Sequence, residues 1–97
     1  IALSVMEGDS PDCQILCAQA ADQLLSIKGI IASFVAGVNS FGQTVVSARS
    51  LGDINVQVIM EKMGGGGHLT TAAAQVDTPP KEVLSQLREM LIEEEEI

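Results

Sequence analysis

Residues 30–50 read IIASFVAGVNSFGQTVVSARS, and this stretch decides the fold. Its two runs rich in β-branched residues, 30–39 and 43–50, are separated by a three-residue connection that contains Gly42, which is the pattern of a β-hairpin. The first run is apolar at odd and at even positions, so we expect its strand to be covered on both faces. We therefore predict a single α/β domain, with a mixed β-sheet of about four to five strands flanked by helices on both faces.

The segment before the hairpin predicts a strand followed by a helix. Residues 2–6 are a short apolar run that is typical of a strand. Ser10 can then cap a helix with Pro11 at its first position, and the helix is expected to reach Ile27 because Gly29 can end it. The apolar stripe of this helix is expected to consist of Cys13, Cys17, Ala20, Leu24 and Ile27.

Residues 53–63 fit two patterns. Their first half alternates apolar and polar residues as in a strand, whereas the apolar side chains at 56, 59, 60 and 63 follow one face of a helix. We favour the helix, because Asp53 or Asn55 can cap its start and Gly64 can end it.

The last third of the chain predicts a strand and a helix. The segment TTAAAQV is expected to bend into a strand near Ala73–Val76. Thr78, Pro79 and Pro80 then begin a helix. Its core-facing side chains are expected to be Val83, Leu84, Leu87 and Leu91.

Composition argues against a long nucleic acid as a partner. The chain of 97 residues has a net charge of −8, no Trp, no Tyr and two Phe, so it lacks both a basic surface and aromatic platforms for stacked bases. Half of the excess charge lies in Glu93 to Glu96, and we expect residues 93–97 to form an acidic tail after a domain of residues 1–92. The apolar runs of the chain are too short for a membrane span.

Cysteine usage and the first residue suggest a reduced cytosolic setting and a longer parent. Cys13 and Cys17 share one face of the predicted helix without a second cysteine or histidine pair, so we expect buried free thiols and no metal site. The chain opens on Ile1 without a signal peptide, so we expect a piece excised from a larger protein.

Four consecutive glycines, Gly64, Gly65, Gly66 and Gly67, stand directly before the single histidine of the chain. Glycines without Cβ atoms can turn their N–H groups inward as a nest that binds phosphate or carboxylate oxygens. Neither a dinucleotide-binding GxGxxG nor a P-loop GK[ST] is present, so the glycines alone fit a flexible loop as well.

His68 follows the glycines and has two interpretations. A lone histidine is often a hydrogen-bonded structural residue. Beside a glycine loop, its imidazole can instead transfer a proton to a leaving oxygen or stabilise charge on a phosphoryl group. His68 alone lacks the neighbouring ligands that a metal ion needs.

Arg49 lies near the end of a predicted strand, between Ser47 and Ser50. A guanidinium can hold a phosphate with two parallel N–H donors, and the hydroxyls could add to such a site. The alternative is an arginine on an edge strand that pairs with one of the thirteen acidic residues. If strand end, glycine nest and imidazole meet, they form an anion pocket.

Three segments, SARS, NVQVIMEKMGGGGH and AAAQV, together resemble the DHH-associated domain of DHH-family phosphoesterases. In detail they are similar to the C-terminal part of the GdpP-type cyclic-di-AMP phosphodiesterases. The resemblance extends from about Ser4 to Glu89, and GGGGH with SxRS upstream is its specific signal.

The resemblance implies a mixed sheet with flanking helices and a role as the substrate-binding domain of a phosphodiesterase that hydrolyses cyclic-di-AMP or a similar small dinucleotide. It implies that Arg49, Gly64 to Gly67 and His68 contact the substrate, with His68 assisting catalysis. Manganese is expected in an upstream DHH domain of the same chain, and no cofactor in this piece, which alone is expected to be inactive. The similarity to GdpP-type relatives, which are membrane-anchored with cytoplasmic catalytic parts, implies a cytoplasmic domain of a membrane-anchored parent, and a homodimer is one open assembly.

Three alternative hypotheses remain. The domain could be a nucleic-acid-binding module, a substrate domain for short oligonucleotides, or an interaction domain whose glycines only let a neighbouring chain approach closely. The nucleic-acid-binding module expects a basic face and a steep salt dependence of binding.

Overall fold

The hairpin predicted over residues 30–50 forms the middle of the sheet. The computed structural model, which describes residues 1–10 and 12–95, pairs β2 (Ala32–Asn39) antiparallel with β3 (Thr44–Ser50). Asn39 organises the turn, since its Oδ1 accepts hydrogen bonds from the backbone nitrogens of Phe41 at 2.9 Å and Gln43 at 3.0 Å. The β-branched pattern therefore identified the right strands and the right connection.

Five strands build the sheet, in the order β1-β2-β3-β5-β4. β1 (Ala2–Ser10) is parallel to β2, whereas β5 (Thr71–Val76) is antiparallel to β3, and β4 (Gly66–Gly67) is antiparallel to β5 at the edge. The predicted mixed sheet is confirmed. The two-residue strand β4 was not predicted, because glycines carry no strand preference.

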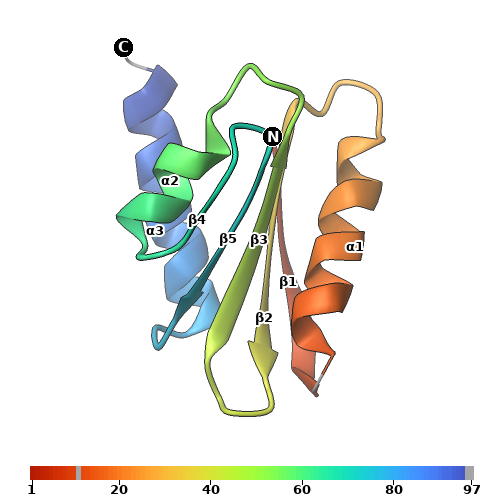
Figure 1. Cartoon of the computed structure of the whole chain (residues 1–97), viewed down its shortest axis with the longest axis vertical. Coiled ribbons are helices and arrows are strands. Elements are labelled where there is room, and N and C mark those ends of the chain that lie inside the picture. Colours follow the sequence, from red (N-terminus) through yellow and green to blue (C-terminus); the bar gives the residue numbers. More distant parts are fainter. Residues whose placement is uncertain (11, 96–97) are drawn as a thin grey trace.

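Helices cover both faces of the sheet, as predicted (Figure 1). α1 (Cys13–Leu25) packs on one face, mainly against β2 and β3. α2 (Val56–Lys62) and α3 (Pro80–Glu95) cover the other face. The result is a three-layer α/β domain.

Strand alternation sends side chains to two separate cores. The larger core lies between the sheet and the α2–α3 layer. It consists of Ala32, Phe34, Ala36, Val46, Ala48, Val56, Ile59, Met60, Ala72, Ala74, Val83, Leu87 and Leu91. The smaller core lies under α1. It consists of Cys13, Cys17, Ala21, Val35 and Val45. Both parities of β2 are thus buried, as its sequence predicted.

The boundaries of β1 and α1 differ from the prediction. β1 extends to Ser10, so Ser10 belongs to a strand and does not cap the helix, whose N-cap is Asp12. Pro11, expected at the first helical position, lies outside the described residues. The helix ends at Leu25, which leaves Ile27 53% exposed and makes its predicted place in the buried stripe wrong.

α2 confirms the helical interpretation of residues 53–63. Of the two predicted caps, Asn55 is the one used: its Oδ1 accepts from the backbone nitrogens of Gln57 at 3.0 Å and Val58 at 3.3 Å. Gly64 ends the helix with a positive φ of 86°, which explains the first of the four glycines.

α3 confirms the last predicted helix and buries the expected face, with Val83, Leu87 and Leu91 in the core and Leu84 packed against it. The helix continues through part of the predicted acidic tail, to Glu95, while residues 96–97 lie outside the described part. The division at residue 92 stays a prediction. No helix among the described residues has the length and apolar composition that crossing a membrane requires.

Candidate functional site

The candidate site lies where α1 stops covering the sheet. Val45, Ser47 and Arg49 alternate along β3 on its α1 side, and Thr71, Ala73 and Gln75 lie opposite them on β5. α1 packs on β2 and β3, so the α1 side of β5 and β4 borders an open groove.

A hollow of about 280 Å³ in this groove gathers most of the predicted site. Five of the predicted residues line it: Ser47, Arg49, Gly66, Gly67 and His68. Its other lining residues are Gln14, Ala18, Thr71, Ala72 and Ala73. Residues from the third strand, the glycine segment and the first helix therefore meet, although they are far apart in the sequence.

The glycine segment is not the open nest that the sequence suggested. The backbone nitrogen of Gly64 donates to the Glu61 oxygen at 3.0 Å and that of Gly65 to the Met60 oxygen at 2.8 Å, so both close the end of α2. Gly66 and Gly67 pair with β5. The prediction of a concave row of free N–H groups is wrong for Gly64 and Gly65, because the end of the helix uses their N–H groups.

Close contact between β4 and β5 explains two more glycines. A Cβ atom on Gly65 would lie 2.1 Å from the Ala73 oxygen, and one on Gly67 would lie 2.5 Å from the Ala72 Cα. Gly66 has neither demand, since its φ lies outside the left-handed region and a Cβ there would meet nothing within 4 Å. The fold therefore does not require glycine at residue 66, which faces the hollow.

Arg49 carries the positive charge of the site and already has partners. Its Nε donates to Asp22 Oδ1 at 2.8 Å, and its Nη1 donates to the Ala48 oxygen at 2.9 Å. A guanidinium has five N–H groups, so three of them have no hydrogen bond within the described residues. The side chain of Arg49 is only 15% exposed, against 64% for Asp22.

The ion pair with Asp22 confirms one part of the alternative interpretation of Arg49, namely that it pairs with an acidic residue. The arginine does pair with an acidic residue, but it lies on β3, the central strand, and not on an edge. An arginine that is largely buried and lines a hollow keeps a desolvated charge available to an anion.

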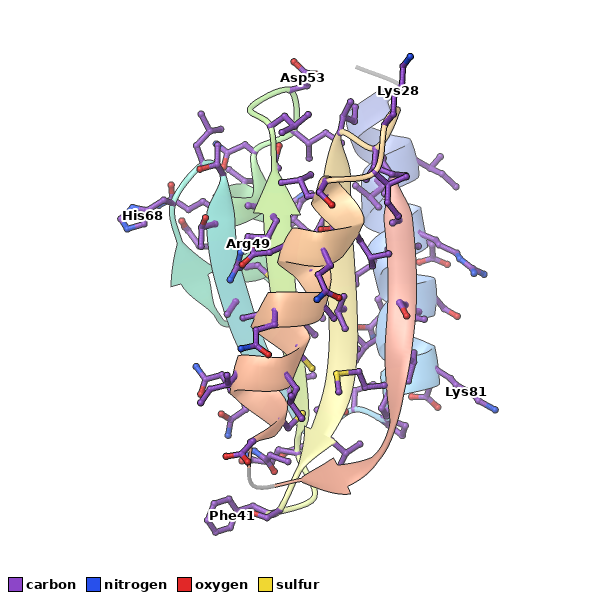
Figure 2. The ribbon with its side chains drawn as sticks, turned by 90° about the vertical axis from the view of Figure 1, so that its right-hand side faces the viewer. Lys28, Phe41, Arg49, Asp53, His68 and Lys81 are labelled. Atoms are coloured by element: carbon purple, nitrogen blue, oxygen red, sulfur yellow. The ribbon has the colours of Figure 1, made fainter. Side chains whose placement is uncertain are left out.

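His68 lines the hollow at its outer rim. Its backbone nitrogen donates to the Thr71 oxygen at 2.6 Å, which fixes the chain at the end of β4. Figure 2 shows the imidazole directed away from the molecule, whereas Arg49 lies between α1 and the sheet. Both residues line the same hollow, but their side chains point in different directions.

The two serines beside Arg49 separate. Ser47 is 2% exposed and lines the hollow. Ser50 does not line it: its Oγ accepts from the backbone nitrogens of Gly52 at 3.0 Å and Ile54 at 3.4 Å in the turn after β3. The expectation that Ser50 joins the site is therefore not met. Gly64 and Gly65 line an adjoining hollow instead.

The described residues do not suit a manganese ion, since no group of three His, Cys, Asp or Glu side chains gathers among them. Cys13 and Cys17 are buried free thiols whose sulfurs lie 3.7 Å apart. Burial first, and then the neighbouring Cys13, raise the pKa of Cys17 from 9.0 to about 12, so its thiol stays protonated.

The contribution of α1 to the site was not predicted, because only the apolar stripe of this helix was derived from the sequence. Gln14, Ala18 and Asp22 are four residues apart and therefore lie on one face of the helix, beside the buried stripe. Gln14 and Ala18 line the hollow, and Asp22 reaches Arg49. The sequence signal for this role was the presence of two polar residues, Gln14 and Asp22, on one helix face next to the cysteine stripe.

Comparison with known proteins agrees with this architecture. The family model described as the DHHA1 domain matches residues 14–96. A cyclic-di-AMP phosphodiesterase GdpP from Geobacillus thermodenitrificans is 51% identical over 92 residues, which cover 92% of this chain and 14% of that protein. A cyclic-di-AMP phosphodiesterase PdeA from Listeria monocytogenes is 50% identical over 76 residues, covering 78% of this chain and 12% of the relative.

Among solved structures, one that shares the fold illustrates the likeness. It is a pGpG-specific phosphodiesterase, PggH from Vibrio cholerae, with a TM-score of 0.50 and 20% sequence identity. The match covers 65% of this chain and 22% of that one. The chain thus spans a small fraction of the length of the relatives that it matches.

Proposed function

This chain belongs to the DHHA1 domain family, and we propose that it is the substrate-binding part of a metal-dependent phosphodiesterase that hydrolyses cyclic-di-AMP, or a similar small dinucleotide, to a linear dinucleotide. One observation carries the proposal: Arg49, Ser47, Gly66, Gly67 and His68 border a single hollow beside α1. The names of two relatives that are about half identical to this chain supply the substrate class.

Each residue has a separate role in this proposal. Arg49 offers N–H donors to phosphate oxygens, and Ser47 adds a hydroxyl from the same strand face. Gly66 and Gly67 give the ligand a wall without side chains, so that a phosphate can approach the backbone closely. His68 lies at the rim, where its imidazole can donate a hydrogen bond or a proton to a leaving oxygen.

The proposal assigns the remaining chemistry to another part of the parent protein. The described residues gather no metal ligands, so we place manganese in an adjoining DHH domain of the same chain. Bound there, the metal would supply an activated water. This chain's own residues bind the substrate and orient it, which by itself lowers the barrier to reaction.

The same proposal sets the domain in the cytoplasm, as part of a membrane-anchored parent. Its two cysteines support this setting, because buried free thiols persist in a reducing compartment. The site described above is formed within a single chain, so the proposal does not require a homodimer.

Substitutions in the parent enzyme test the assignment. Arg49→Ala and His68→Ala are each expected to lower turnover of cyclic-di-AMP by about tenfold or more, because each removes a group that stabilises charge on the reacting phosphate. Both variants are expected to unfold at nearly the wild-type temperature.

Arg88→Ala is the matched control, since Arg88 is exposed on α3, on the far side of the sheet. It removes one positive charge without touching the hollow and is expected to keep wild-type turnover. Wild-type rates for Arg49→Ala and His68→Ala, at saturating and at limiting substrate, would refute the site.

A further inference from the structure

A second hollow adjoins the first along α1. It has a volume of about 270 Å³ and shares Gln14 and Ala73 with the hollow of Arg49. Gly64, Gly65, Val45, Ala74 and Gln75 complete its lining. The proposed function uses none of its side chains.

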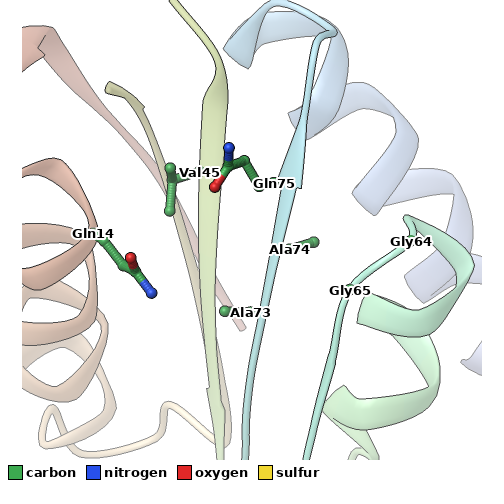
Figure 3. Close-up of a pocket in the computed structure, with 7 residues that line it drawn as sticks. All are labelled: Gln14, Val45, Gly64, Gly65, Ala73, Ala74 and Gln75. Atoms are coloured by element: carbon green, nitrogen blue, oxygen red, sulfur yellow. The ribbon is translucent and has the colours of Figure 1, made fainter. Parts of the chain in front are cut away.

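The walls of this second hollow are two amides, and its floor is small and apolar. Figure 3 shows Gln14 extending from α1 and Gln75 extending from β5, toward each other across β3. Val45 and Ala73 lie between them on neighbouring strands. A flat ring can rest on such a floor while its polar edge meets an amide.

The spacing between the two hollows suits a nucleotide. Ser47 pairs with Ala73 and Val45 pairs with Gln75, so the two hollows are displaced by two residues along β3 and β5. Two residues of a strand span about 7 Å. A phosphate beside Ser47 and Arg49 therefore leaves its attached ribose and base within reach of Gln75.

A relay of three side chains sets the direction of the Gln75 amide. Gln43 Nε2 donates to Asp77 Oδ1 at 3.3 Å, and Gln75 Nε2 donates to Gln43 Oε1. A carboxylate only accepts hydrogen bonds, so Asp77 turns the NH₂ group of Gln43 toward itself. The Gln43 oxygen then faces Gln75, and Gln75 is left to present its own Oε1 as an acceptor.

We infer that this second hollow is a nucleobase subsite, in which Gln75 Oε1 accepts from the amino group of a base such as adenine and Gln14 contacts the same ring. The inference rests on the proposed function, because the phosphate beside Arg49 places the base. The subsite would explain why the domain prefers one base over another, which the proposed function alone does not explain. Glutamine amides are well suited to the adenine edge, with its amino donor and its ring acceptor.

Nuclear magnetic resonance titrations of the 97-residue chain with three probes test the inference. The probes are adenosine 5′-monophosphate, inosine 5′-monophosphate, which carries a carbonyl where adenine has the amino group, and ribose 5-phosphate, which has no base. All three are expected to shift the Gly66 and Gly67 amide signals. Only the nucleotides are expected to shift the side-chain amides of Gln14 and Gln75.

Affinities give the second readout. Adenosine monophosphate is expected to bind about 2- to 12-fold more tightly than ribose 5-phosphate, as one hydrogen bond allows. Gln75→Met should abolish this gain without changing the affinity for ribose 5-phosphate. Gln86→Met, on the exposed side of α3, is the matched control and should keep the gain. Asp77→Asn should reduce the ratio of the affinities for adenosine and inosine monophosphate. An asparagine amide can present either its oxygen or its NH₂ group to Gln43, so the orientation of the Gln43 and Gln75 amides would no longer be fixed.

The outcomes separate the inference from the proposed function. If all three probes shift Gly66 with equal affinity, and Gln75→Met changes nothing, the nucleobase subsite is wrong and the phosphate site stands. If no probe shifts the signals of Gly66, Gly67 or Arg49, the proposed function fails. Shifts at Gln14 and Gln75 alone would then leave a base site without a phosphate site, which would overturn the geometry argued above.

Discussion

Gly65 and Gly66 are neighbours on which the fold makes opposite demands. A Cβ at Gly65 would lie 2.1 Å from a β5 carbonyl oxygen, whereas a Cβ at Gly66 would meet nothing within 4 Å. We expect Gly65→Ala to lower the free energy of unfolding by about 1–3 kcal/mol or more, because β4 must move away from β5. Gly66→Ala should change it by less than about 1 kcal/mol.

Although Gly66→Ala should leave stability nearly unchanged, we expect it to weaken ligand binding. Gly66→Ala places a methyl group at the wall of the Arg49 hollow, so the folded variant should bind ribose 5-phosphate more weakly than wild type does. Urea unfolding and the same titration on each variant provide the two measurements. A stable Gly66→Ala variant with unchanged binding would show that this wall does not touch the ligand.

Asp22 competes with the ligand for Arg49. Its carboxylate occupies the Nε side of the guanidinium at 2.8 Å, and its negative charge opposes an incoming phosphate. We expect Asp22→Asn to tighten the binding of ribose 5-phosphate, since the amide keeps the shape and removes the charge. Stability should change by less than about 1 kcal/mol, because Asp22 is 64% exposed.

Calorimetric titration and urea unfolding of the Asp22→Asn variant check both expectations. Asp53→Asn, in the exposed turn before α2, is the control for a general loss of negative charge. Weaker binding by Asp22→Asn than by wild type would mean that Asp22 holds Arg49 in its binding position and does not oppose the ligand.

Single residues also show the limit of sequence reasoning. Arg49 was predictable, because an arginine inside a β-branched run is unusual and its chemistry is specific. Its partner was not, since Asp22 meets it only through the way α1 lies across β3. The purpose of Gly65 and Gly67 was equally hidden, because it depends on the distance between β4 and β5, whereas Gly64 was correctly predicted to end α2.

At the scale of elements, α1 is held on β2 through two sulfur atoms. Cys13 and Cys17 fill the space above Gly37, where a Cβ would lie 2.8 Å from both sulfurs. Helix and strand therefore approach closely at this point, and the thiols are sealed between them. This packing is the cause of the raised pKa of Cys17.

The buried thiol predicts how stability depends on pH. In the unfolded chain Cys17 ionises near its ordinary pKa of 9.0, whereas the folded domain raises that pKa to about 12. The thiol contribution is therefore complete below pH 9 and is lost as the pH rises from 9 towards 12, because the unfolded state releases the proton first. Cys17→Ala removes this ionisation.

Urea unfolding at a series of alkaline pH values measures the effect. The free energy of unfolding of the wild type should fall more steeply above pH 9 than that of Cys17→Ala, whatever the absolute loss from the smaller side chain. Parallel curves for the two proteins would contradict the raised pKa.

An element can be predicted from the sequence when a repeating local pattern specifies it, and cannot when it depends on contact with a neighbouring strand. Helices α2 and α3 were identified from their apolar spacing, because a buried face repeats every three to four residues. β4 left no such pattern, since two glycines become a strand only when β5 lies beside them. The length of β1 was underestimated for a related reason: its second half pairs with β2 after a register shift, where the apolar run has already ended.

At the scale of the whole molecule, the sheet order brings the site together. β3 and β5 are neighbours although 20 residues separate Ser50 from Thr71, and the glycine segment returns along the far edge of β5. The sequence predicted the layers, and five of the ten residues that line the hollow of Arg49 are among the predicted site residues. It could not predict which side of the sheet carries the groove, because that depends on α1 covering only part of one face.

Charge separates the proposed function from a nucleic-acid-binding module. The chain has a net charge of −8, and within the described residues the hollow has one cationic side chain, Arg49, already beside Asp22. A ligand held by about one phosphate contact should lose only about threefold in affinity between about 50 and 200 mM salt. Single-stranded RNA should gain nothing over a linear adenine dinucleotide, because no row of cations follows its backbone in the groove as described.

Fluorescence titrations of the chain with both ligands, at several salt concentrations, measure these slopes. Arg49→Ala should flatten the slope for the dinucleotide, whereas Arg88→Ala, remote from the groove, should leave it unchanged. Each phosphate contact adds to the salt dependence, so a protein that follows a long strand loses about a thousandfold or more over this range. A loss of that size with RNA would place the domain among nucleic-acid-binding modules, and the groove beside α1 would then need a ligand many phosphates long.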